Sequence, residues 1–321
     1  MKIFYLIQKS GNIWAFLFKM SLNLPNIPNL FPNSNRVDQG LGNVRVGQAT
    51  IVVATDGSGD TDNIQDAINA LPAAGGGIYI KEGTWNLDTY IHLNKPSISI
   101  IGVGQRTLIQ ITGNHGAFAI TQDGCIIKNL RIKGNNTGVA QHGIGISSDK
   151  CQIADCWIDD MGAYGILVAN GANGTILNHN HITDSEVNGI AVLCIAGQTT
   201  ANTIISENVI DDTKGVGIWI SAIGAGAIVE HSNISNNIII DPDSGAAGNA
   251  PGILFTANTG GLCKRNIVLG NHVIDGGDWG IEIIEADTSE TIISCNLLEN
   301  CISGGINDAG TSTEIGHNIE S

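Results

Sequence analysis

The chain has 321 residues, of which 42 are glycine, 14% are charged and 5% are aromatic, and its formal net charge is −15. The glycines follow no three-residue period, which excludes a collagen-like triple helix, and the length allows one large domain or two small ones. Residues 1–50 carry five basic residues against Asp38, a charge of +4, so the remainder carries −19. This acidity argues against a nucleic-acid partner. It also disfavours a uronate substrate unless a cation or a basic patch intervenes.

Residues 1–50 differ in character from the rest of the chain. The stretch MKIFYLIQKSGNIWAFLFKM is basic and aromatic, and SLNLPNIPNLFPNSNRV is rich in Pro and Asn. We expect an extended N-terminal extension that mediates assembly into a homo-oligomer such as a trimer, attaches the protein to a larger particle, or is loosely ordered. The apolar run 13–18 is too short for a secretory signal, and no stretch is long enough to span a membrane. Localisation stays open, with lysis or assembly into a virus particle as routes out of a cell.

The sequence of residues 51–96 predicts an N-terminal cap followed by the first strands. In DGSGDTDNIQDAINALPAAGGGIYIKEGTW, apolar residues fall at i, i+3, i+4 and i+7 from Ile64 to Leu71, which predicts a short amphipathic helix. Thr61 and Asp62 can cap its start, and the following Pro ends it. A glycine triplet then turns the chain into a strand with alternating isoleucines.

From residue 97 to the C-terminus one pattern recurs, with a Gly-Ile pair in each unit. The glycines of these pairs lie at 143, 165, 189, 217, 252, 280 and 305. Each unit holds two or three short β-branched runs broken by Gly, Asn and Asp, without a helical period, which predicts a β-solenoid. In successive units, the position immediately before the second apolar residue of a run is occupied by Asn129, Cys156, Asn180, Asn208, Asn237, Asn271 and Asn296. Stacked asparagines can hydrogen-bond along the axis at tight turns.

Together these features resemble the pectate-lyase-like superfamily, which includes polysaccharide-degrading enzymes and phage tailspikes. The cap sequence and the repeat carry the resemblance over roughly residues 50–320. It implies an all-β fold, a single-stranded right-handed parallel β-helix of seven or eight coils, with the short helix covering the first coil. No family's catalytic residues transfer to this chain, because the polygalacturonase-like, pectate-lyase and alginate-epimerase motifs are incomplete.

Acidic residues directly after the Asn-containing strands form the candidate catalytic column. The column contains Asp159, Asp160, Asp184, Asp211, Asp212, Asp241, Asp275 and Glu299. Coils stack about 4.8 Å apart, so neighbouring carboxylates approach the spacing of retaining glycosidases and raise one another's pKa. The catalytic candidates are Asp159, Asp160, Asp184, Asp211 and Asp212, where the acids are densest. Two alternatives stay open: Asp is a favoured turn residue in any repeat, and a carboxylate ladder can hold Ca²⁺.

Substrate-binding candidates lie in the loops that follow these acids. They are His142, Tyr164, Glu186, Lys214 and Trp279. Aromatic faces stack on sugar rings and histidine can transfer protons, so the sequence predicts a polysaccharide ligand. The leading interpretation is a glycoside hydrolase with paired carboxylates. The alternatives are a polysaccharide lyase and a non-catalytic structural or receptor-binding β-helix.

No metal site and no cofactor are predicted, apart from the Ca²⁺ alternative. The pair His179 and His181 lacks a third ligand, and the seven cysteines contain no CxxC pair. We expect the cysteines to be small buried residues in a reducing compartment. The C-terminus begins another coil without a cap, so we expect a partner chain or the N-terminal segment to cover it.

Overall fold

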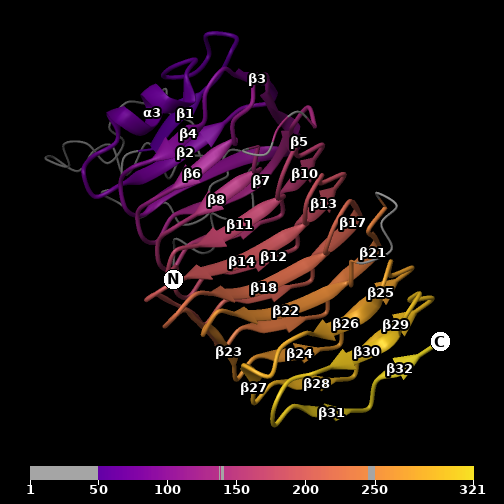
Figure 1. Ribbon diagram of the computed structural model, residues 1–321. Helices are drawn as coiled ribbons and strands as arrows, with labels where there is room; N and C mark the ends of the chain where they lie inside the picture. Colours follow the sequence, from indigo (N-terminus) through magenta and orange to yellow (C-terminus); the bar gives the residue numbers. More distant parts are fainter. Residues whose placement is uncertain (1–49, 137, 139–140, 245–249) are drawn as a thin grey trace, which may run out of the picture. The chain divides into compact units, whose positions relative to one another are not determined.

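The computed structural model describes residues 50–136, 138, 141–244 and 250–321. This part of the chain is a right-handed parallel β-helix with one short helix at its N-terminal end (Figure 1). The predicted fold class is confirmed. The predicted N-terminal extension 1–50 lies outside the described residues except for Thr50.

Two faces of the β-helix belong to one 19-stranded sheet, and two strands in it, β5 and β7, bend from one face to the other. We name these faces A1 and A2. Along the axis, A1 contains β1 (Thr50–Val53), β2 (Gly76–Ile80), the first parts of β5 (Ile98–Ile111) and β7 (Ile126–Lys133), β9 (Gln152–Ala154), β12 (Ile176–Asn178), β16 (Ile204–Ser206), β20 (Asn233–Ser235), β24 (Ile267–Leu269), β28 (Ile292–Ser294) and β31 (Glu314–Gly316). A2 contains β3 (Gly83–Leu87), the second parts of β5 and β7, β10 (Trp157–Asp159), β13 (His181–Thr183), β17 (Val209–Thr213), β21 (Ile238–Pro242), β25 (His272–Ile274), β29 (Leu297–Glu299) and β32 (Ile319–Glu320).

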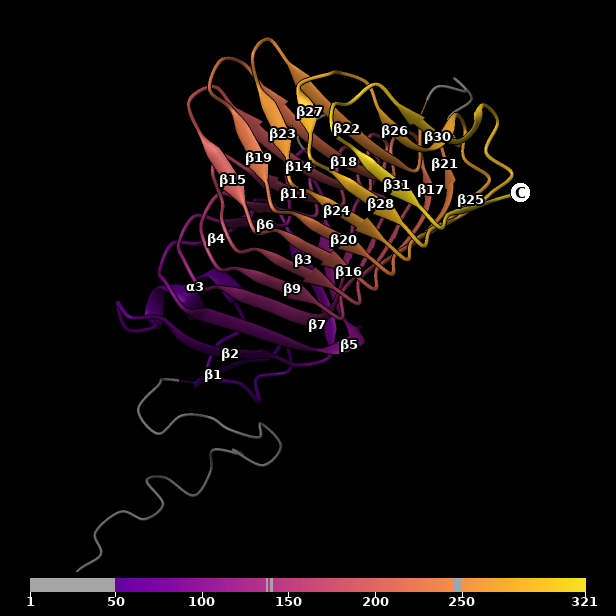
Figure 2. The same cartoon turned by 90° about the horizontal axis from the view of Figure 1, so that it is seen from below.

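The third face, B, is a nine-stranded sheet. It contains β4 (Ile91–Leu93), β6 (Phe118–Ile120), β8 (Ile144–Ile146), β11 (Ile166–Ala169), β14 (Ile190–Ile195), β18 (Ile218–Ile223), β22 (Ile253–Asn258), β26 (Trp279–Ile283) and β30 (Gly304–Asp308). The seven or eight coils expected from the repeat were therefore too few, because β4 and β6 lack the Gly-Ile pair. Longer coils add a four-stranded sheet at one corner, with β15 (Thr199–Ala201), β19 (Ile228–Glu230), β23 (Leu262–Lys264) and β27 (Thr288–Ser289) side by side (Figure 2).

Stacked isoleucines fill the core and explain the Gly-Ile repeat. On face B, Ile166 pairs in register with Ile144 and Ile190, and all three are fully buried. A Cβ atom on Gly165 would lie 2.5 Å from Cγ2 of Ile182. Only glycine fits there, because the chain enters face B against the packed side chains of face A2.

The turn between A1 and A2 carries an asparagine ladder, made of Asn180, Asn208, Asn237, Asn271, Asn296 and Asn318, which is buried except at its last member, Asn318. In each step an amide Nδ2 donates to the Oδ1 of the next asparagine, for example 2.9 Å from Asn208 to Asn237. Each Oδ1 also accepts from a backbone N–H of the preceding coil, as Asn180 Oδ1 does from Cys156. The prediction that Asn129 belongs to the ladder was wrong. Asn129 lies one residue before the ladder position of its coil, in a left-handed conformation with φ 58°.

The N-terminal helix α3 (Ile64–Ala70) covers the first coil with Ile64, Ala67 and Ile68. Its N-cap is Asn63, whose side chain accepts from Asp66 N at 3.1 Å, so the expected caps Thr61 and Asp62 were each placed too early. The Lys95 ammonium donates to three carbonyl groups at the C-terminal end of the helix, at 2.6–3.0 Å. These contacts satisfy carbonyls that the short helix leaves unpaired.

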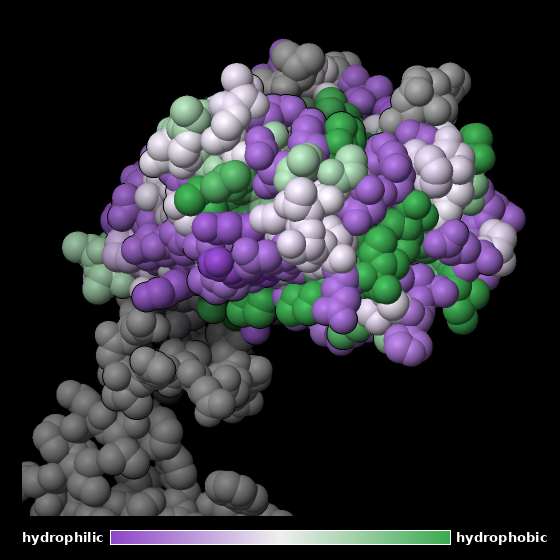
Figure 3. Space-filling view, turned by 60° about the horizontal axis from the view of Figure 1, so that its bottom comes forward, coloured by the Kyte–Doolittle hydropathy of each residue, from purple (hydrophilic) through white to green (hydrophobic). Residues whose placement is uncertain are grey.

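At the other end, β31 and β32 each pair on one side only within the described residues. Ile302, Ile315 and Ile319 are 76%, 47% and 62% exposed. Figure 3, in which the end with β28 and β31 is turned forward, shows apolar side chains in patches among polar ones. That a partner chain or the N-terminal segment covers this end stays a prediction.

All seven cysteines are free thiols, and five of them are buried. Burial raises the pKa of Cys156 and of Cys263 to about 12, so these thiols are unreactive near neutral pH. Within the described ranges, no helix has the length and apolar character needed to cross a membrane.

Candidate active site

The turn from face A2 to face B carries a column of carboxylates that we call the carboxylate ladder. It consists of Asp160, Asp184, Asp212, Asp241 and Asp275, all in the left-handed conformation with φ between 47° and 59°. Asp and Asn tolerate this conformation better than other residues with side chains, which is one reason for their presence. In the next coil the same turn is formed by Asn300, whose Nδ2 donates to Asp275 Oδ1 at 3.1 Å. This turn therefore accepts asparagine as well as aspartate, so its backbone conformation alone does not explain five successive aspartates.

Asp159 and Asp211 do not belong to this ladder, although each is adjacent to one of its members in sequence. Asp159 lies on β10 and Asp211 on β17, and in the register of face A2 Thr183 of β13 lies between them. The single column expected from the sequence is therefore two columns. Asp211 lies on the outer face of β17 and is half-buried.

Asp159 is buried and is held by two cations. Its carboxylate accepts from Arg131 Nε at 2.9 Å and from the second guanidinium nitrogen at 2.7 Å, a bidentate pair. Lys133 Nζ lies 3.7 Å from Asp159 and 2.8 Å from Asp160. The hydrogen bond to Asp159 raises the pKa of Arg131, and the hydrogen bond to Asp160 raises the pKa of Lys133. Both carboxylates are thus paired with cations at the N-terminal end of the ladder.

The middle of the ladder holds two coupled carboxyl groups, Asp184 and Asp212, whose pKa values shift in opposite directions. Burial, and then the hydrogen bond and charge of Asp212, raise the pKa of Asp184. A hydrogen bond from Ser244 lowers the pKa of Asp212, and the hydrogen bond with Asp184 lowers it further. Asp184 is therefore the weaker acid of the two and Asp212 the stronger, so a single proton shared by them favours Asp184. Burial and neighbouring charges, Asp212 first among them, raise the pKa of Asp241 in the next coil.

Two substrate-binding candidates lie in the loops beside this carboxyl pair. Lys214 N donates to Ser185 O at 2.9 Å, and Glu186 N donates to Met161 O at 2.8 Å. Glu186 is exposed. The charge of Lys214 acts on both Asp184 and Asp212 and lowers the pKa of each.

Of the aromatic candidates, the structure brings His142 and Tyr164 together and leaves Trp279 apart. Their rings stack with centroids 5.1 Å apart and an interplanar angle of 14°. Burial lowers the pKa of His142 and raises the pKa of Tyr164, so both are neutral near pH 7. Trp279 begins β26, four strands along face B from β11, or about 19 Å away.

A second aromatic stack on face A2 was not among the sequence candidates. Trp157 and His181 pair in register, with ring centroids 3.8 Å apart and an angle of 8°. Trp157 lies two residues before Asp159, and His181 lies two residues before Thr183, so all four residues lie on the same outer face. Burial lowers the pKa of His181, which Asp211 and Asp159 partly offset. The alternation of the strands contained this signal, but the register between coils was needed to find it.

Residues 69–260, more than half of the chain, match the family model described as "NosD: Periplasmic copper-binding protein (NosD)". Within the described ranges, however, no group of three or more His, Cys, Asp and Glu side chains lies close enough to hold a metal ion. The copper of the family description therefore has no matching ligand set among these residues.

Among curated proteins, the chain is similar to a probable pectinesterase/pectinesterase inhibitor of Arabidopsis thaliana. The two are 28% identical over 191 residues, which cover 54% of this chain and 31% of the relative. The chain thus spans about a third of that relative's length.

Solved structures share the fold at low sequence identity. An alginate lyase from Paenibacillus sp. superposes with a TM-score of 0.58 at 17% identity, over 84% of this chain and 99% of that one. The ORF18 protein of Geobacillus virus E2 superposes with a TM-score of 0.56 at 14% identity, over 79% of this chain and 56% of that one. These similarities show the fold alone.

Proposed function

The chain belongs to the NosD family, and we propose that its carboxylate ladder hydrolyses a glycosidic bond of a polysaccharide. Asp184 is the general acid and Asp212 is the nucleophile. The observation that carries this proposal is the placement of Asp184 and Asp212 at the same turn of neighbouring coils, with opposite pKa shifts. Two carboxyl groups whose environments separate their pKa values are the usual means of assigning acid and base at such a site. The pectinesterase relative and the alginate lyase neighbour support a polysaccharide as the class of substrate.

The geometry favours retention of anomeric configuration. Neighbouring coils lie about 4.8 Å apart, close to the roughly 5–5.5 Å between carboxyl groups of retaining enzymes. The sugar binds between the two carboxyl groups. Asp184 then protonates the glycosidic oxygen as Asp212 attacks the anomeric carbon. Asp184, now ionised, next deprotonates the water that releases the sugar.

A depolymerisation screen tests this proposal. We expect purified protein to shorten a polysaccharide without producing the ultraviolet absorbance of unsaturated ends, and NMR to show retention in the first product. Absorbance would identify a lyase instead. Inversion of the anomeric configuration would mean that Asp184 acts with Asp241, two coils away, and not with Asp212. Absence of shortening on neutral and acidic polysaccharides would favour the non-catalytic alternative.

The rate of cleavage should have an acidic maximum. Asp184 must be protonated, and its raised pKa carries that state to higher pH than for an ordinary aspartate. Asp212 must be ionised, and its lowered pKa carries that state to lower pH. Activity therefore falls above the pKa of Asp184 and below that of Asp212. Lys214→Gln, which removes a charge that lowers both pKa values, should move both limbs of the profile to higher pH. A profile that is unchanged in this variant would contradict the assignment.

A non-catalytic β-helix is the second candidate, and one observation favours it. Every member of the carboxylate ladder occupies a left-handed turn for which Asp is suited on backbone grounds alone. The similarity in fold to a virus protein is compatible with a structural or receptor-binding role. Such a protein would bind a glycan without shortening it.

A further inference from the structure

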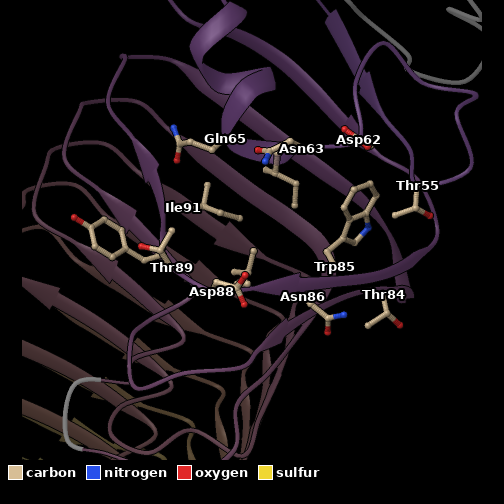
Figure 4. A pocket seen from close by; sticks show the side chains of 13 residues that line it. Thr55, Asp62, Asn63, Gln65, Thr84, Trp85, Asn86, Asp88, Thr89 and Ile91 are labelled. Carbon is tan, nitrogen blue, oxygen red and sulfur yellow. The ribbon is translucent and has the colours of Figure 1, made fainter.

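A cavity of about 360 Å³ lies at the N-terminal end of the β-helix, between the start of α3 and the segment that contains β3 (Figure 4). Asp62 and Asn63 line it on the side of the helix, and Trp85, Asn86 and Asp88 on the side of β3. Its volume is in the range of small-molecule sites. None of the residues proposed for cleavage lines it.

The lining has the chemistry of a site for an uncharged sugar. Trp85 is 5% exposed and presents a buried aromatic wall, while Tyr90 is 48% exposed. Aromatic faces pack against the C–H faces of sugar rings. The lining includes Asp62 and Asp88 and contains no Lys or Arg, so a uronate would be repelled.

Several polar groups of the cavity are available to a ligand. Asp62 and Asn86 are exposed, and neither side chain is hydrogen-bonded within the part of the chain that the structure describes. Asp88 accepts from Thr112 Oγ1 at 3.0 Å through Oδ1, which leaves its second oxygen. Gln65, in contrast, is occupied by both polar groups of the His92 backbone. Carboxylate and amide groups that face an aromatic wall can fix sugar hydroxyls.

The cavity is continuous in register with the carboxylate ladder. Asn86 pairs with Gln110, and Gln110 with Lys133. From Lys133 the same row continues to Asp159 and Thr183, next to Asp184. Four strand steps separate β3 from β13, a distance of about 19 Å. Among the described residues, β3 pairs on face A2 only with β5, so the row ends at the cavity.

We infer that this cavity is the subsite that holds the end of a neutral polysaccharide whose chain runs along face A2 to the Asp184–Asp212 pair. The inference rests on the proposed hydrolysis and specifies its substrate. Among the described residues the row stops at β3, and Thr55 and Asp62 of the segment before α3 line the cavity there, which favours a chain end over a continuous chain. Cleavage at a fixed distance from that end gives products of one length.

The first test measures binding apart from cleavage. Asp184→Asn protein would be titrated calorimetrically with a panel of neutral and uronate hexasaccharides. We expect a neutral member to bind, and Asn86→Ala or Tyr90→Ala to weaken it about tenfold, which equals about 1.4 kcal/mol. Asn94→Ala, an exposed asparagine outside the cavity, is the matched control and should bind as the parent does. Preference for uronates, no neutral binder, or equal affinity of the cavity variants would overturn the inference.

The second test measures product length with end-labelled polysaccharide. The wild-type protein should release one main length, and Tyr90→Ala a mixture. If cleavage depends on Asp184 but the product lengths do not change in Tyr90→Ala, the end subsite is wrong and the hydrolysis stands. If binding depends on the cavity but no glycan is cleaved, the acid pair is wrong and the sugar site stands.

Discussion

Asp184→Asn should lower kcat for polysaccharide cleavage by about 10²–10⁴-fold, the usual contribution of a general acid. The amide keeps the size of the side chain and can still hydrogen-bond to Asp212, but it cannot protonate the leaving oxygen. Asp212→Asn should cause a loss at least as large, because it removes the nucleophile. Substrate binding should change little, so kcat and kcat/KM should fall together. Initial rates of reducing-end formation measure both values.

Asp275→Asn is the matched control for this loss. It lies in the same left-handed turn, and Asn300 shows that asparagine adopts that turn in the next coil. Its activity should stay within about twofold of wild type, since it lies two coils beyond the pair. An equal loss in Asp184→Asn and Asp275→Asn would mean that the ladder acts through its total charge or its fold. The acid–base assignment would then be wrong.

Asn208→Ala should destabilise the β-helix by about 3–5 kcal/mol. Its Oδ1 accepts from the backbone N–H and from Nδ2 of Asn180, and its own Nδ2 donates to Leu177 O and Asn237 Oδ1. All of these groups are buried, and each one left without a partner costs about 1–3 kcal/mol. Urea denaturation followed by circular dichroism would measure the loss. Because coils contact only their neighbours, unfolding is expected to begin near the substituted coil.

The control for this change is Asn258→Ala, on the exposed end of β22. Its side chain makes no hydrogen bond within the described residues, so stability should change by less than about 0.5 kcal/mol. If both variants lose stability equally, the ladder contributes through strand propensity. If neither loses stability, water replaces the lost amide without cost.

The sequence was sufficient for the fold because its strongest signals are local. A Cβ atom on Gly165 would collide with Ile182, so the same constraint repeats glycine before isoleucine in every regular coil. The helix was also readable, since Ile64, Ala67 and Ile68 form one buried face. Asn129 was misplaced because asparagine suits both the left-handed turn residue and the ladder residue that follows it. Sequence alone does not distinguish two adjacent positions that favour the same residue.

The candidate site depended on contacts between coils, which sequence spacing does not give. Asp159 and Asp160 are neighbours in the chain, but one lies on a strand and the other in a turn. Arg131 reaches Asp159 from the preceding coil, 28 residues earlier. Tyr164 and Trp279 hold equivalent places in the repeat and still lie four strands apart. Position within a coil was predictable, whereas proximity along the axis required the register.

The stacking of coils also determines how such a chain can change over generations. Ile190 faces Ile166 on one side and Ile218 on the other, so loss or duplication of one whole coil brings isoleucine against isoleucine again. Loss of one residue within a strand would instead invert the side chains after it in that strand. The glycines of the Gly-Ile pairs are 22 to 35 residues apart, so differences in length accumulate at the corners. Recombination between coils can therefore lengthen the β-helix while the interior keeps its packing.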